Sequence, residues 1–164
     1  MKAWLVIAAV ALAAGAAVQA AERLDDSASP RSRVQARVVL SDEGRPLADS
    51  QRPTFAQVTF GRVDYKLSTG RYVGRQARIY YVVPAFIAGL RSPAGLLVEW
   101  RGSGLFASGR ARPGERSLVW SGVVPGPWMS EGLDLAFRVD LRELQLQRDG
   151  RFGFESYFEI EVSP

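Results

Sequence analysis

The chain of 164 residues contains neither cysteine nor histidine. Without cysteine it cannot form disulfide bonds, so burial and strand pairing must stabilise the fold. Without histidine it lacks the commonest general base and the commonest metal ligand. The usual Cys–His and Ser–His arrangements for acyl transfer are therefore excluded, and no bound metal or cofactor is expected.

Lysine is scarce as well. After residue 20 the only lysine is Lys66, whereas there are 19 arginines and 17 acidic residues. The acidic residues alternate with the arginines almost throughout, which is typical of a solvated surface. The small net positive charge argues against a nucleic-acid-binding function.

The first 20 residues have the three parts of a secretion signal. A basic start, Met1-Lys2, precedes an uncharged apolar run from Ala3 to Val18, and Val18-Gln19-Ala20 places small residues before a cut at Ala21. The alternative is an uncleaved membrane anchor, but the run of 16 residues is shorter than the roughly 20 that a spanning helix needs. The sequence therefore predicts a signal peptide over 1–20 and a periplasmic, secreted or cell-surface protein that is not an integral membrane protein.

The next segment is polar. Residues 22–33 include one large apolar residue, Leu24, and such a composition cannot bury enough surface to offset the entropy of ordering. We expect a flexible N-terminal lead over 21–33, followed by a single β-sandwich domain over 34–164.

Hydrophobic residues alternate with polar ones in most of the remaining chain, and this period of two is typical of half-buried strands. We expect Gly61 to mark a β-bulge or break. The predicted strands are 34–40, 54–60 continuing to 67, 76–83, 96–101 and 117–124.

The clearest alternation covers residues 133–141, and its phase slips near Arg142-Glu143, where a β-bulge is expected. The turn sequence Arg148-Asp149-Gly150-Arg151 then predicts a hairpin to a return strand over 152–162. In this hairpin the acidic residues of the return strand would form cross-strand ion pairs with residues such as Arg138.

These patterns predict an all-β fold, namely a single antiparallel β-sandwich of seven or eight strands, with an immunoglobulin-like arrangement as the expected topology. A closed barrel, including one in an outer membrane, is the alternative.

Two groups of residues are candidate contacts for a partner or ligand. Trp128 and Met129 follow Pro125-Gly126-Pro127, so they are expected on a stiff loop, where they would either touch a partner or plug the end of the sandwich. A basic cluster contains Arg110, Arg112 and Arg116 and could meet an anionic polymer, although a solvated arginine face would give the same pattern.

The sequence favours a non-enzymatic interaction or assembly module of the bacterial cell envelope. Its partner would be another envelope protein or an anionic or saccharide surface polymer. A first alternative is a surface-fibre subunit or adhesin, similar in kind to pilus subunits, whose extension completes a neighbour's sheet. The paired cysteines and penultimate aromatic residue of many such subunits are absent here. A second alternative is an envelope glycan enzyme that uses carboxylates.

Overall fold

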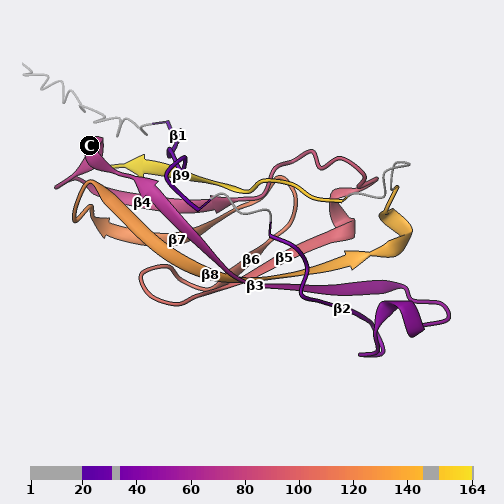
Figure 1. The fold of residues 1–164 in the computed structure, drawn as a ribbon. Helices are drawn as coiled ribbons and strands as arrows, with labels where there is room; N and C mark the ends of the chain where they lie inside the picture. The colour runs from indigo at the N-terminus through magenta and orange to yellow at the C-terminus, as the bar shows by residue number, and fades with distance from the viewer. Residues whose placement is uncertain (1–19, 31–33, 146–151, 164) are drawn as a thin grey trace, which may run out of the picture.

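The computed structural model describes residues 20–30, 34–145 and 152–163. The predicted signal peptide, apart from Ala20, lies outside the described residues. Within them, nine strands form two antiparallel sheets that pack against each other (Figure 1). This arrangement confirms the predicted all-β sandwich, but the strand number exceeds the seven or eight expected.

The larger sheet has five strands in the order β2-β3-β8-β5-β6. Their bounds are β2 Val38–Ser41, β3 Phe55–Ser68, β8 Trp128–Asp140, β5 Leu96–Gly102 and β6 Gly109–Ala111. The long strands β3 and β8 pair along their whole length. The predicted bulge is confirmed, because the register shifts between Thr59 and Gly61, where Gly61 has a φ of 79° that favours glycine.

The smaller sheet has four strands in the order β1-β9-β4-β7. Their bounds are β1 Glu22–Arg23, β9 Tyr157–Val162, β4 Gln76–Val82 and β7 Arg116–Val123. The helical elements are short 3₁₀ turns, η1 Leu47–Asp49, η2 Gly70–Tyr72, η3 Pro93–Gly95 and η4 Leu141–Glu143. Across the described ranges, no helix has the length and apolar character to cross a membrane.

The hydrophobic core lies between the sheets and is rich in aromatic rings. Tyr81 of β4 packs against Phe158 of β9 at 5.3 Å between ring centroids, and against Trp100 of β5 at 4.5 Å. All three side chains are buried. The core therefore contains side chains from both sheets, because the inward-facing residues of the two sheets interdigitate.

The N-terminal lead differs from the flexible segment that its composition predicts. Glu22–Arg23 pairs with β9, and Leu24 is only 2% exposed in the core. The backbone N–H of Ser68 donates to the carbonyl of Asp25 at 2.8 Å. One buried leucine and several backbone hydrogen bonds are enough to fix residues 22–25, although the average composition is polar.

The predicted hairpin between residues 133–141 and 152–162 is wrong in its pairing. Its turn lies outside the described residues, but β8 and β9 belong to different sheets, and β9 pairs with β1 and β4. The phase slip near Arg142 arises because β8 ends at Asp140 and the 3₁₀ turn η4 follows, so it is not a bulge. The two-sheet arrangement does not test the immunoglobulin-like topology, which stays a prediction.

Candidate functional site

The sandwich has a groove along one edge because its two sheets differ in length. Strands β3 and β8 have 14 and 13 residues, whereas β4 and β9 have 7 and 6. The larger sheet therefore extends beyond the smaller one. Beside this extension lies the segment 152–156, which precedes β9 and is not a strand. The space between this segment and β3 is the feature that we call the edge groove.

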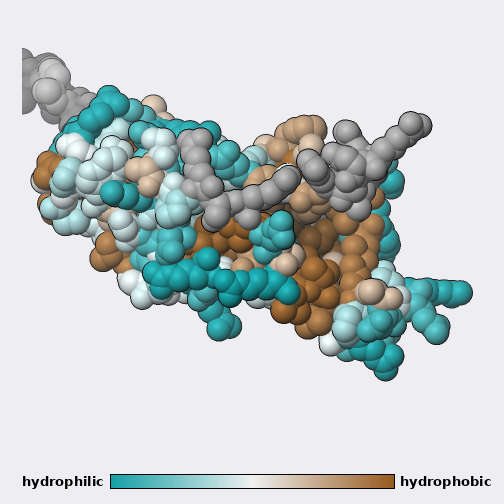
Figure 2. All heavy atoms as spheres, viewed as in Figure 1, coloured by the Kyte–Doolittle hydropathy of each residue, from teal (hydrophilic) through white to brown (hydrophobic). Residues whose placement is uncertain are grey.

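The edge groove has a volume of about 620 Å³, within the usual range for small-molecule sites. In Figure 2, hydrophobic residues gather in a hollow on this face of the molecule. The lining residues are Asp26, Ser29, Pro30, Val34, Phe60, Val63, Asp64, Tyr65, Tyr81, Ala88, Leu135, Phe137, Phe152, Gly153, Phe154, Glu155 and Ser156.

Four phenylalanines line the edge groove, namely Phe60, Phe137, Phe152 and Phe154. The ring centroids of Phe60 and Phe137 are 4.4 Å apart, and Phe154 stacks on Phe137 at 5.1 Å. These three side chains pack against the core but are only partly buried. A ligand in the edge groove would therefore cover apolar surface that the sandwich itself leaves partly open to solvent.

Three hydroxyl groups meet at the inner end of the edge groove. Tyr65, Tyr81 and Ser156 all line this end, where Tyr81 and Ser156 are buried and the ring centroids of the two tyrosines are 6.4 Å apart. Burial is the main cause that raises the pKa of both tyrosines above the ordinary value of 10.0. Both phenols therefore remain protonated at neutral pH and act as neutral hydrogen-bonding groups.

The rim of the edge groove is acidic. Asp26, Asp64 and Glu155 line it. Asp64 accepts a 2.8 Å hydrogen bond from Nε of Arg62, which offsets much of its charge. Glu155 lies 4.0 Å from Arg23, and both side chains are largely exposed, so water screens that pair. Asp26 and Glu155 both act on Tyr65 as negative charges.

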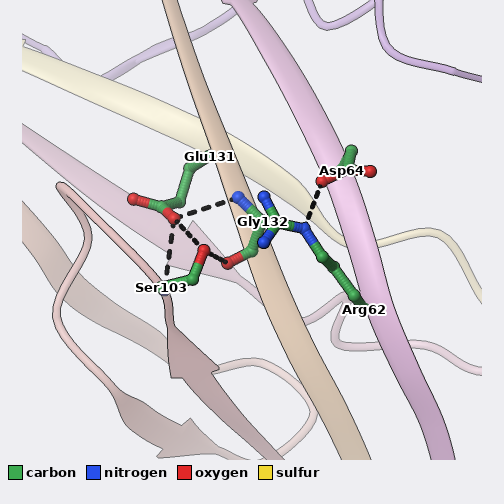
Figure 3. A network of polar contacts seen from close by, with 5 residues as sticks. All are labelled: Arg62, Asp64, Ser103, Glu131 and Gly132. Carbon is green, nitrogen blue, oxygen red and sulfur yellow. Dashed lines mark hydrogen bonds and ion pairs between the residues drawn. The ribbon is translucent and has the colours of Figure 1, made fainter.

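A second polar cluster fixes the loop that follows β5. The Glu131 carboxylate accepts hydrogen bonds from the backbone N–H groups of Ser103 and Gly132 and from the Ser103 hydroxyl (Figure 3). It also accepts a hydrogen bond from the backbone N–H of Phe106. Burial opposes the charged form of Glu131, but these hydrogen bonds outweigh it and lower its pKa below the ordinary 4.5. Because the carboxylate is already saturated with donors, its role is structural.

The predicted contact residues Trp128 and Met129 have opposite environments. Trp128 begins strand β8 rather than lying in a loop, and it is 46% exposed. The Lys66 ammonium lies 4.9 Å from the centre of its ring, so one face of the indole is shared with a cation. Met129 is only 2% exposed and belongs to the core, so it is not available to a partner.

The predicted arginine cluster is not brought together with Trp128. In the larger sheet, Arg110 of β6 pairs with Glu99 of β5, and Glu99 pairs in turn with Ala136 of β8. Ala136 lies eight residues from Trp128 along β8. At roughly 3.3 Å per residue this separation is about 26 Å.

The arginines themselves also separate. Arg112 donates to the carbonyl of Ala94 at 2.8 Å. Arg116 lies in the smaller sheet, over the Tyr80 ring, and donates to Glu161 at 2.7 Å. Arg110 is exposed on the larger sheet. Two of the three arginines therefore stabilise their own chain, and the predicted basic patch is divided between the two sheets.

The carboxylates of the described segments do not assemble into a metal centre: no group of three or more possible ligands from Asp and Glu occurs there. No protein-family model, curated protein or solved structure matches the chain. The fold and the edge groove are thus the observations from which function can be argued.

Sequence reasoning missed the edge groove although it identified some of its parts. The return strand predicted over 152–162 includes Phe152 and Phe154, which both line the edge groove. That Phe154 would stack on Phe137, which itself packs on Phe60, without residues 152–156 forming a strand depends on the unequal sheet lengths. The hydrophobic periodicity of one segment does not indicate the relative lengths of two sheets.

Proposed function

We propose that this chain is an exported, non-enzymatic binding module of the bacterial cell envelope, and that the edge groove holds an apolar ligand. The observation that supports this proposal most directly is the aromatic lining of a 620 Å³ groove at the open edge of a sandwich. Sites for small molecules are commonly concave, mainly apolar and furnished with a few converging polar groups. The three hydroxyls at the inner end of the edge groove fit that description.

A binding role fits the chemistry better than catalysis does. The sequence offers no histidine or cysteine as base or nucleophile, and the hydroxyls of Tyr65 and Tyr81 are held in the neutral form by burial. A glycan enzyme would use the carboxylates of Glu155, Glu159 and Glu161. Of these, Glu159 and Glu161 are engaged by Arg116, and Glu155 lies 4.0 Å from Arg23. We therefore favour ligand capture over an envelope glycan enzyme.

The fibre-subunit alternative requires an N-terminal extension that is free to enter a neighbour. Residues 22–25 instead pair with β9 and β3 of their own chain. The Ser29 hydroxyl also accepts a 2.8 Å hydrogen bond from the backbone N–H of Lys66. These contacts favour a free-standing module, which could use the exposed Trp128 to reach a partner protein or surface polymer.

Binding can be tested with N-phenyl-1-naphthylamine, an uncharged apolar dye that fluoresces when it leaves water. Residues 21–164 should bind it at a single site. The variant Ala88→Trp places a large ring on an exposed residue of the groove lining and should abolish binding with little change in melting temperature. The matched control Ala85→Trp lies on the same connection, outside the lining, and should bind as the parent does. Absence of dye binding by the parent chain would contradict the proposed function.

A further inference from the structure

The inner end of the edge groove has spare hydrogen-bonding capacity. Tyr65, Tyr81 and Ser156 line this end and contribute three O–H donors. A linear chain of three hydroxyls uses two of these donors internally. One donor and several oxygen lone pairs remain for other partners. Tyr65 is only partly buried and lines the edge groove, whereas Tyr81 and Ser156 are buried, so Tyr65 is the most exposed of the three residues.

The charge around this polar end is unfavourable for an anion. The described lining contains three carboxylates, on Asp26, Asp64 and Glu155, and neither lysine nor arginine. Asp64 is offset by Arg62, but Asp26 and Glu155 add negative potential at Tyr65. A carboxylate brought to the hydroxyl chain would lose hydration and gain no cationic partner within this lining.

We propose that the edge groove selects molecules with an apolar body and an uncharged hydrogen-bonding end, such as a medium-chain alcohol or amide, over fatty carboxylates. The apolar body would lie against Phe60, Phe137 and Phe154, and the polar end would reach Tyr65. This inference rests on the proposed function, since it specifies what the edge groove binds.

The selectivity can be measured by displacement of N-phenyl-1-naphthylamine with two eight-carbon probes, 1-octanol and octanoate, at pH 7.5. Octanol should displace the dye at a concentration at least roughly tenfold lower than octanoate does, because the carboxylate is desolvated without a compensating charge. The substitution Tyr65→Phe should weaken octanol roughly five- to tenfold, the effect of one lost hydrogen bond, and leave octanoate little changed.

The charge contribution has its own test. The double variant Asp26→Asn, Glu155→Gln should strengthen octanoate several-fold and leave octanol unchanged, whereas the control Asp42→Asn, in a turn outside the lining, should alter neither. The sequence between Pro30 and Val34 contains Arg31 and Arg33, which lie outside the described residues. Octanoate binding as tight as that of octanol would mean that a basic side chain reaches the ligand, and would overturn the selectivity but not the proposed function. Failure of the dye itself to bind would overturn both.

Discussion

Glu131 shows how one side chain can order a whole loop. Its carboxylate receives donors from Ser103 and Phe106, which bracket the first part of the segment between β5 and β6. The side chain is only 6% exposed, so the loss of its charge would leave several buried N–H groups with a weaker acceptor. Loop position in this region is thus set by a residue more than 20 positions later in the chain.

We expect Glu131→Gln to lower the free energy of unfolding at pH 7 by about 2 kcal/mol, the usual contribution of hydrogen bonds to a charged group. The folded-state pKa of Glu131 lies below 4.5. Its stabilisation is therefore present above about pH 4.5 and is lost as the pH falls through the folded-state value. Urea titrations at pH 7 and pH 3 should show the difference between parent and variant narrowing in acid.

The matched change Glu43→Gln, in an exposed turn where the nearest cation is 3.9 Å away, serves as the control. It should alter stability by less than about 0.5 kcal/mol at both pH values. A pH-independent loss in Glu131→Gln would contradict the role of the charge.

Two glycines that face different neighbours give a second prediction at the residue scale. A Cβ at Gly102 would overlap the backbone carbonyl of Phe106, whereas the atoms nearest to a Cβ at Gly132 belong to the guanidinium end of the Arg62 side chain, which can move more easily than backbone. Gly102→Ala should cost about 2–3 kcal/mol because backbone must move, and Gly132→Ala should cost less than about 1 kcal/mol. Gly126→Ala, where the added carbon meets open space, is the control for both. Equal urea midpoints for the three variants would contradict the close approach at Gly102.

At the scale of elements, the short strand β1 is the part that composition failed to predict. The pairing of Glu22–Arg23 with β9 brings Leu24 into the core. The backbone N–H of Leu24 donates to Phe158 of β9, and the carbonyl of Asp25 accepts from Ser68 of β3. The contribution of β1 to stability depends on a single apolar side chain, that of Leu24. The average composition of the 12 residues 22–33 cannot reveal the effect of one side chain.

Leu24→Ala should therefore lower the free energy of unfolding by about 2–4 kcal/mol, as expected for a buried leucine that leaves a cavity. Chemical denaturation of residues 21–164 would measure this change. Leu105→Ala, at a leucine that is 54% exposed, should cost less than about 0.5 kcal/mol. If both variants are as stable as the parent, the N-terminal segment is flexible, as its composition suggests.

The partner of the C-terminal strand β9 could not be predicted from local sequence either. Alternation in residues 152–162 correctly indicated extended, half-buried chain, and β9 lies within it. The choice of partner was wrong because strand type is a local property, whereas pairing depends on which edges remain available once the sheets form. Glu161 consequently accepts hydrogen bonds from Arg116 and Tyr80, residues that lie more than 40 positions earlier.

At the scale of the whole molecule, the two sheets bury one continuous core, and the N-terminal segment is held by its own chain. We expect purified residues 21–164 to be a monomer with one cooperative thermal transition. Light scattering after gel filtration, combined with a melt, would measure both. Polymers, or a chain that folds only when a strand-forming peptide is added, would favour the fibre-subunit alternative.

The sequence by itself determined the all-β class, most strand positions, the bulge at Gly61 and the absence of disulfide bonds, since each follows from local periodicity or composition. Tertiary structure decided that β8 and β9 lie in different sheets, that Met129 is buried while Trp128 is exposed, and that the predicted arginines separate. It also decided the edge groove, because this groove lies where the larger sheet extends beyond the smaller one. Strand length and side-chain alternation are encoded locally, but the relative extent of two packed sheets emerges only when distant segments meet.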